Sequence, residues 1–190
     1  MTDDAEEVRP VKLETIITQP VVDTERMVLR PIRKSDAGTL SLFGADERVA
    51  RMTRTIPHPL PPGAVETFIE RALDEATDEH TWVMDGSITG LGEFLGLISL
   101  ERMDRKQSEI GFWVVPAFWN SGLASEAVRG LIGANPHNDT TMVASVFQDN
   151  AASARVLTNA GFQYLGDAET FAVARGATVP TWTYLKRLDD

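Results

Sequence analysis

The amino-acid sequence predicts an α+β domain with one central sheet that helices cover on both faces. Two observations carry this prediction. Apolar segments of strand length alternate along the chain with segments whose apolar residues recur at helical spacing. The segment 109–115 is apolar on both faces after its glutamate, as a central strand covered from both sides should be, and Pro116 ends it.

The first residues differ from the rest of the chain in composition. They mix charged residues, Thr, Gln and prolines with a short apolar patch, so we expect a mobile or loosely docked leader over residues 1–20. The stretch 11–22 has residues suited to an added edge strand. No later segment has the composition of an interdomain linker, so we expect a single domain over residues 21–190.

The domain is expected to open with a strand and two helices. Arg26–Arg33 combines apolar residues, expected to face inward, with arginines, expected to face water. Ser35 begins a capping pair that predicts a helix ending near Phe43. Pro61-Pro62 opens a second helix with apolar residues at helical spacing. These two helices form one cover of the sheet.

A meander of strands follows, and the second half of the chain alternates helices with strands. The meander consists of 80–84, 93–100 and 109–115, with a turn at Asp85-Gly86. Apolar stripes predict helices from Leu123 to Ile132 and from Ala152 to Ala160, the second ended by Gly161. Further strands are expected at 141–147, around 162–165 and at 181–187.

Composition excludes several classes of function. The chain has 190 residues and a formal net charge of −10, which argues against general nucleic-acid binding because that needs a contiguous basic surface. It has no cysteine, hence no disulfide, thiolate nucleophile or Cys-ligated metal, and its 3 histidines are too far apart for a paired metal motif. An acidic start and the lack of a long apolar run predict a cytoplasmic protein without a membrane span.

The most informative stretch is 109–127. A buried strand ends at a proline, a short turn holds Asn120, Ser121 and Gly122, and an amphipathic helix starts at once. This arrangement aims free main-chain N–H groups and the positive end of the helix dipole at the space above the turn. An anion such as a pyrophosphate would fit there. The alternative is an ordinary helix start capped by Asn120 or Ser121.

A second turn from strand to helix follows at Asp149-Asn150. Asn150 is a candidate N-cap and Ser153 its partner three residues later. Both residues can hold these structural roles and still take part in a site.

Three segments, taken in chain order, carry a resemblance to a known family: Trp119–Ala127, Asn150–Ser153 and Ala160–Phe162. Together they resemble the GNAT superfamily of N-acetyltransferases. The opening Thr24–Ile32 and the segment Ile110–Trp113 are most similar to the RimJ/RimL-like branch, the ribosomal-protein-alanine acetyltransferases. The match covers about 24–188.

The resemblance implies acetyl-CoA as donor, an amine as acceptor and direct transfer without a covalent acyl-enzyme. It implies a mixed, mostly antiparallel sheet in which the central strands 109–115 and 141–147 splay apart around the pantetheine arm. By this resemblance, main-chain groups of Trp113, Val114 and Val115 would bind the pantetheine, and main-chain amides would bind the pyrophosphate. Asn150 would bond near the pantetheine or fix the second turn. Ser153 would lie near the thioester sulfur. The pyrophosphate amides belong to Asn120, Ser121, Gly122, Leu123, Ala124 and Ser125.

The turn departs from the family pattern in its charge. The family usually begins this loop with Gln or Arg, whereas here it begins with Trp119 and holds no basic residue before Arg129. Phosphate binding would then rest on main-chain dipoles. Arg129 and Arg155 are candidates to reach the nucleotide end of the donor.

An amine must lose a proton to attack a thioester, and Glu109 is the best candidate for the base, directly or through water. Its position resembles that of a catalytic glutamate in some family members; the alternative is a strand-end charge paired with an arginine. Ser153, which the resemblance places near the thioester sulfur, is the candidate to give the thiolate a proton or hydrogen bond. Family members often use a tyrosine farther along, but Tyr164 suits a core or strand-surface role better. A main-chain amide of Val114 or Val115 would polarise the thioester carbonyl.

Two classes of function remain after this comparison. The first is an N-acetyltransferase acting on a protein or peptide N-terminus or on a small amine, with 51–62 and 167–180 as the acceptor wall and a monomer or homodimer as the assembly. The second is a non-catalytic acyl-CoA-binding or regulatory domain, an alternative that the missing basic residues in the loop keep open. No metal is expected in either.

Overall fold

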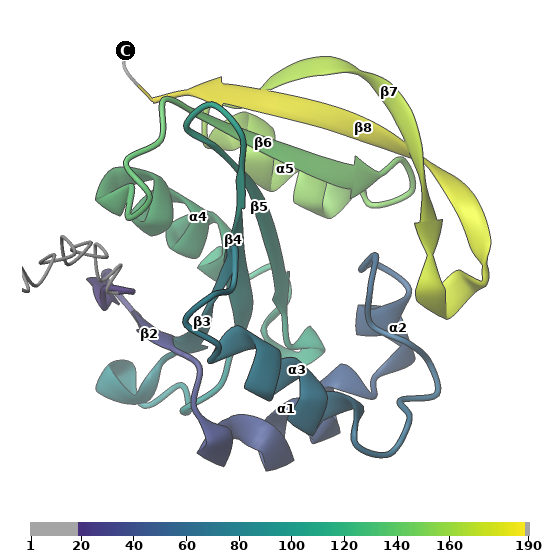
Figure 1. The fold of residues 1–190 in the computed structure, drawn as a ribbon. Helices are drawn as coiled ribbons and strands as arrows, with labels where there is room; N and C mark the ends of the chain where they lie inside the picture. Colours follow the sequence, from purple (N-terminus) through teal and green to yellow (C-terminus); the bar gives the residue numbers. More distant parts are fainter. Residues whose placement is uncertain (1–18, 189–190) are drawn as a thin grey trace, which may run out of the picture.

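The computed structural model describes residues 19–188 and shows one sheet with helices on both faces (Figure 1). Within residues 19–188 the sheet has 8 strands in the order β1-β2-β3-β4-β5-β6-β8-β7, and only β5 and β6 run parallel there. The strands are β1 Val22–Asp23, β2 Val28–Pro31, β3 Glu79–Asp85, β4 Gly96–Met103, β5 Gln107–Val114, β6 Thr141–Phe147, β7 Gln163–Ala172 and β8 Ala177–Arg187. This mixed, mostly antiparallel α+β fold confirms the predicted class.

The helices form two covers. One consists of α1 (Ala37–Gly44), α2 (Glu47–Ala50) and α3 (Ala64–Ala72), and the other of α4 (Leu123–Ala134) and α5 (Ala151–Asn159). Successive residues of a strand point to opposite faces, so β3 places Val83 in the cluster under α1 and α3 and Trp82 in the cluster under α4 and α5. Two cores, one on each face, therefore hold the sheet.

The two central strands separate along most of their length. β5 and β6 pair only where Gln107–Glu109 lies beside Thr141–Val143, although both strands continue beyond this point. Beyond it the second edge of β6 remains paired with β8 as far as Phe147. The splayed strands expected from the family resemblance are thus confirmed, and Glu109 is the last residue of β5 before they diverge.

A buried polar network closes the paired end of these strands. The Ser108 hydroxyl donates to Asp139 Oδ2 (2.5 Å) and lies 2.7 Å from His137 Nδ1, and His137 Nε2 lies 2.9 Å from His80 Nδ1. Burial first, then His80 and Arg102, lower the pKa of His137 to about 4. The neutral imidazole therefore joins β3, β5 and the connection before β6.

Several boundaries differ from the sequence predictions. α2 was not predicted, because a helix of 4 residues leaves no apolar periodicity to detect. β4 starts at Gly96 rather than near Glu93. Arg30, expected to face water, is buried and forms ion pairs with Asp36 (2.8 Å) and Asp85 (2.7 Å). The apolar pattern alone could not reveal these partners.

Most of the expected leader, residues 1–18, lies outside the described residues, as does most of the stretch suggested as an edge strand; its end forms β1. Among residues 19–188, no helix is both long and apolar enough to cross a membrane. The same part of the chain contains no group of His, Asp and Glu side chains suited to a metal ion.

Candidate active site

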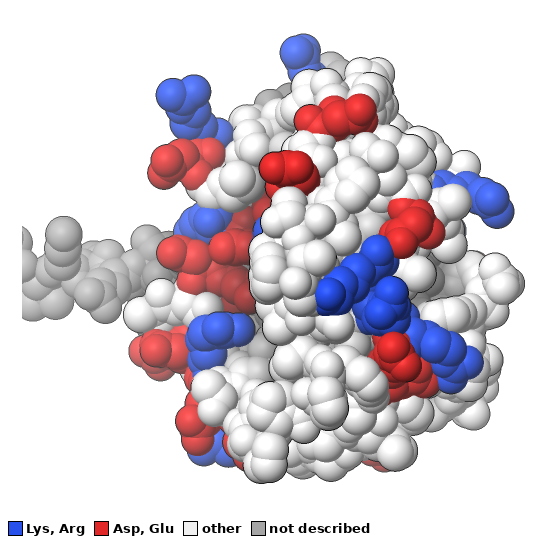
Figure 2. Space-filling model, turned by 90° about the vertical axis from the view of Figure 1, so that its right-hand side faces the viewer, with Lys and Arg blue, Asp and Glu red and all other residues white. Residues whose placement is uncertain are grey.

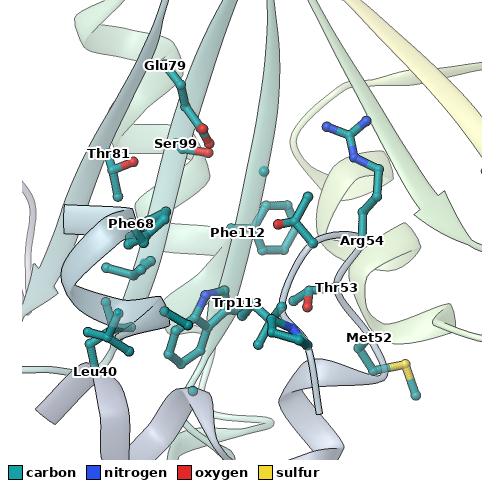
Figure 3. Close-up of a pocket in the computed structure, with 18 of the residues that line it drawn as sticks. Leu40, Met52, Thr53, Arg54, Phe68, Glu79, Thr81, Ser99, Phe112 and Trp113 are labelled. Carbon is teal, nitrogen blue, oxygen red and sulfur yellow. The ribbon is translucent and has the colours of Figure 1, made fainter. Parts of the chain in front are cut away.

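A cavity of about 660 Å³ lies on the face of the sheet that α1 and α3 cover, beside the gap between β5 and β6. Residues that point to this face from β3, β4, β5 and β6 form its floor, and the α2–α3 connection forms much of its outer wall. Figure 3 shows Glu79 and Arg54 toward one end and Phe68, Trp113 and Leu40 toward the other. The cavity therefore has a charged end and a mainly apolar end.

Three glutamates form a row at the charged end. Glu79 of β3 is the cross-strand partner of Glu101 of β4, which is in turn the partner of Glu109 of β5, and all three line the cavity. Like charges directly opposite each other destabilise a sheet. A row of this kind costs stability, so it indicates a site rather than a structural device.

Glu109 lies at the point where the central strands part, with its side chain 25% exposed. Burial is the main cause that raises the pKa of its carboxyl; Arg54 lowers that pKa, and Glu101 and Glu79 raise it. Arg54 Nη1 lies 3.8 Å from Glu109 Oε2. The sequence left two roles open for Glu109, a catalytic base and a strand-end charge paired with an arginine. Both remain compatible with the structure, because Glu109 is paired with Arg54 and also lines the cavity.

Much of the segment 51–62, expected to belong to the acceptor wall, lines the cavity. The β7–β8 tip, which is the turn Val173–Arg175 between these strands, is hydrogen-bonded to this segment. The loop residues 52–57 and 60–63 line the cavity, whereas the 167–180 connection contributes Thr170. Val173 N–H donates to Arg54 O (3.1 Å), and Arg175 Nε donates to Arg51 O (2.8 Å). Figure 1 shows the tip reaching toward α2, and Figure 2 shows this side of the molecule, where basic and acidic side chains lie next to one another.

The turn before α4 leaves main-chain amides free. Gly122 is the N-cap of α4 with φ 81°, and no side chain caps the helix. The Ser121 hydroxyl instead donates to Phe118 O, and Asn120 itself has φ 60°. Ordinary capping by Asn120 or Ser121, the alternative interpretation, is therefore not what the structure shows. The positive end of α4 is open to an anion.

A basic residue reaches this turn from another part of the chain. Arg26 Nη1 donates to Ser121 O (2.9 Å), and Arg26 Nε donates to Glu126 Oε2 (2.7 Å). A Cβ built on Gly122 would lie 3.4 Å from Arg26 Nη2. A cation absent from the loop sequence thus lies beside the turn, and sequence reasoning missed it because 95 residues separate Arg26 from Ser121. No ion pair among the described residues brings Arg129 or Arg155 here.

Trp119, which takes the place of the usual Gln or Arg, joins the turn to the central strand. Its indole Nε1 donates to Val114 O (2.7 Å), and the Arg48 guanidinium lies 5.7 Å from the centre of the indole ring. Its side chain contributes a hydrogen bond within the protein, so the residue positions the turn.

The direction of the β5 main chain decides which residues face the gap. Val115 N–H donates to Leu95 O (2.8 Å). A Cβ on Gly96 would collide with Trp113 O, so this carbonyl also faces β4. Because the main-chain groups of successive strand residues point to opposite edges, those of Val114 face the gap. The expectation that Trp113, Val114 and Val115 all offer main-chain groups to the pantetheine is corrected accordingly. Val115 N–H and the main chain of Trp113 are directed toward β4, away from the gap.

The second turn has the structure expected of a capped helix. Asn150 Oδ1 accepts from Ser153 N–H (3.2 Å), so Asn150 is the N-cap of α5. The Asp149 carboxylate before it accepts two hydrogen bonds from Arg175, at 2.6 and 3.0 Å. The hydrogen bond from Ser153 N–H gives Asn150 a structural role, which is to fix the turn before α5.

Ser153 and Tyr164 lie in different surroundings. The Ser153 hydroxyl has no hydrogen-bond partner among residues 19–188 and lies outside the cavity lining. Tyr164 is 57% exposed and its hydroxyl donates to Asp167 Oδ1 (2.8 Å). Tyr164 is therefore a strand-surface residue, as expected, and Ser153 stays the candidate proton donor.

The splayed strands, the uncapped turn at α4 and the glutamate at the strand divergence define a protein of the acetyltransferase class. A family model described as an acetyltransferase (GNAT) domain matches residues 26–163, and the chain belongs to this family. It is a GNAT N-acetyltransferase, a class of enzyme that transfers the acetyl group of acetyl-CoA to an amine. The alternative of a non-catalytic acyl-CoA-binding domain is thereby set aside.

Relatives of known sequence and structure agree with this assignment. The uncharacterized N-acetyltransferase YoaA of Bacillus subtilis is 27% identical over 87% of this chain and 95% of its own length. RimL, a ribosomal alpha-N-protein acetyltransferase in complex with coenzyme A, has a TM-score of 0.76 at 15% identity, covering 90% and 99% of the chains. MccE, a microcin self-immunity acetyltransferase in complex with acetyl-CoA and AMP, has a TM-score of 0.74 at 17% identity, covering 86% and 93%. The RimJ/RimL-like branch expected from the opening motif is thus among the structural neighbours.

Proposed function

We propose that the acceptor is a primary amine with an apolar body, either a small molecule or the N-terminal residue of a peptide, and that Glu109 removes its proton. The observation that carries this proposal is the position of Glu109, at the divergence of the central strands and inside a cavity with an apolar end. The assembly, monomer or homodimer, stays a prediction. Acetyl-CoA as donor supports the cytoplasm as location.

The lining of the cavity supports this class of acceptor. Side chains at the apolar end include Leu60, Phe68 and Trp113, which would bury the body of the acceptor. The row of glutamates at the other end would attract an ammonium and repel a carboxylate. An amine with a nearby carboxylate, such as a free amino acid, would therefore be a poorer acceptor than the same amine with that carboxylate removed.

The role of Glu109 follows from the proton that the amine must lose. An alkyl amine has a pKa near 10 in water, so it arrives protonated and cannot attack a thioester. Burial raises the pKa of Glu109 above its ordinary value, which makes its carboxylate a stronger proton acceptor. After Glu109 takes the proton, directly or through one water, the neutral amine can attack. The chain has no cysteine, which supports direct transfer over a thioester-linked intermediate.

The described residues fit the donor. The gap between β5 and β6 would hold the pantetheine arm along the edge where the main chain of Phe112 and Val114 points, and Val114 N–H would face the thioester carbonyl. The uncapped amides after Gly122, with Arg26 beside them, would hold the pyrophosphate. Ser153, in the first turn of α5, is the proposed proton donor to the thiolate.

The test is thiol release from acetyl-CoA with a panel of acceptors. The panel pairs phenylalanine with phenylethylamine and with phenylalanine amide, and adds N-terminal peptides, polyamines and aminoglycosides. We expect apolar monoamines or peptides with an apolar first residue to be turned over, and phenylalanine to react more slowly than its amide. Faster turnover of the carboxylate-bearing member of each pair would overturn the proposed acceptor class.

A further inference from the structure

Arg54 faces two carboxylates of the cavity at distances that are long for ion pairs. Its Nη1 lies 3.8 Å from Glu109 Oε2 and its Nη2 lies 3.7 Å from Glu101 Oε2, and its side chain is 47% exposed. Exposed pairs of this geometry contribute little to folding stability. A role for the Arg54 side chain in holding the fold is therefore weakly supported, and its position beside Glu109 calls for another explanation.

The location of Arg54 is fixed by its main chain and not by its side chain. The Arg54 carbonyl accepts from Val173 N–H (3.1 Å), which ties the α2–α3 connection to the β7–β8 tip. A substitution that changes only the side chain leaves this hydrogen bond intact. The charge of Arg54 can therefore be removed while the loop stays in place.

The charged groups around Glu109 come from several elements. Glu101 faces it from β4, Glu79 stands one strand further on in β3, and Arg54 approaches from the α2–α3 connection. Its partner on β6 is Val143, which carries no charge, and Arg71 of α3 also lines the cavity. Of these, Arg54 is the cation that the structure pairs with Glu109.

We propose that Arg54 is a positioning residue for acetyl transfer: its guanidinium holds the Glu109 carboxylate charged and ready to accept the proton of the amine. This inference rests on the proposed role of Glu109 as base. Without Arg54, burial and two neighbouring carboxylates act on Glu109 unopposed, and all three raise its pKa. The fraction of Glu109 that is charged at neutral pH would then fall.

The test compares two variants in the pH dependence of kcat/KM. They should shift its acid limb, the low-pH range in which the rate rises as the base loses its proton, in opposite directions. Arg54→Met keeps the aliphatic stem and removes the charge, so the limb should move up by about half a pH unit to one unit. Glu101→Gln removes a like charge, so the limb should move down. Arg54→Lys should stay close to the wild-type protein. The pH at which the Glu109 carboxyl titrates, followed by NMR in the protein without ligand, should shift in the same directions in these variants.

The outcomes separate this inference from the proposed function. Opposite shifts in Arg54→Met and Glu101→Gln, with near wild-type behaviour in Arg54→Lys, support it. An unmoved acid limb and an unmoved Glu109 titration in Arg54→Met, or shifts of the same sign in both variants, overturn it. If the acid limb survives unchanged in Glu109→Gln, the assignment of the base fails instead, and the NMR titration still decides whether Arg54 acts on Glu109.

Discussion

Replacing Arg26 with methionine tests whether a residue outside the α4 turn supplies the positive charge for the donor phosphates. The side chain makes one hydrogen bond to the Glu126 carboxylate (2.7 Å) and one to Ser121 O (2.9 Å), and it is 37% exposed. Glu126, 8% exposed as a residue, also accepts from the Arg26 main-chain N–H (2.6 Å), a contact that the substitution keeps. The variant therefore removes the cation and leaves the carboxylate in place.

Two effects of different size are expected. Losing hydrogen bonds to a charged group from a partly exposed side chain should destabilise the fold by about 1–2 kcal/mol, or about 2–8 °C in Tm. Losing a charge-assisted contact to a phosphate should cost about 1.5–3 kcal/mol of binding free energy, which is about a 10- to 150-fold weaker Kd for coenzyme A.

Calorimetry with coenzyme A and with pantetheine separates these effects, because pantetheine lacks the phosphates. We expect Arg26→Met to weaken binding of coenzyme A and to leave pantetheine binding unchanged. The double variant Arg26→Met with Glu126→Gln shows whether Arg26 acts only by neutralising Glu126, in which case it regains the wild-type affinity. An unchanged Kd for coenzyme A in the folded single variant would refute the reasoning.

Two further predictions concern the second turn and the buried histidine. Ser153→Ala should lower kcat by about 10²-fold and leave the Kd of coenzyme A unchanged, because the contact to Asn150 uses the main chain of Ser153; an unchanged kcat would remove Ser153 from the chemistry. Stability should fall as the pH is lowered from about 6.5 to about 4, since the unfolded chain takes up a proton at His137 that the folded protein refuses until its pKa of about 4. Urea unfolding across this range should show a smaller loss in His137→Gln, and an equal loss in both proteins would contradict the role of His137.

The sequence allowed the order of elements and the two turns to be predicted because their signals are local. Pro116 ends a strand, Gly122 permits the left-handed conformation at the N-cap of α4, and Gly161 follows α5. The position of Glu109 could be inferred for the same reason, since it directly precedes the apolar part of β5. Each of these features depends on residues within a few positions of one another.

The features that escaped prediction depend on contacts between distant segments. Arg26 at the α4 turn and Arg54 beside Glu109 come from other elements, and no local pattern indicates their partners. The row of glutamates depends on strand register, which the apolar pattern of a strand covered on both faces leaves open. The main-chain direction of Val115 likewise follows from its hydrogen bond to Leu95, the residue before β4.

The pH dependence of kcat/KM in Glu109→Gln tests the central claim most directly. If Glu109 accepts the proton of the amine, the variant should keep its fold and its affinity for coenzyme A, while kcat/KM falls by about 10²–10⁴. Its rate should then keep rising with pH as the amine loses its own proton, without the plateau of the wild-type enzyme. A pH profile in Glu109→Gln that follows the wild type would contradict the account and assign the glutamate to structure.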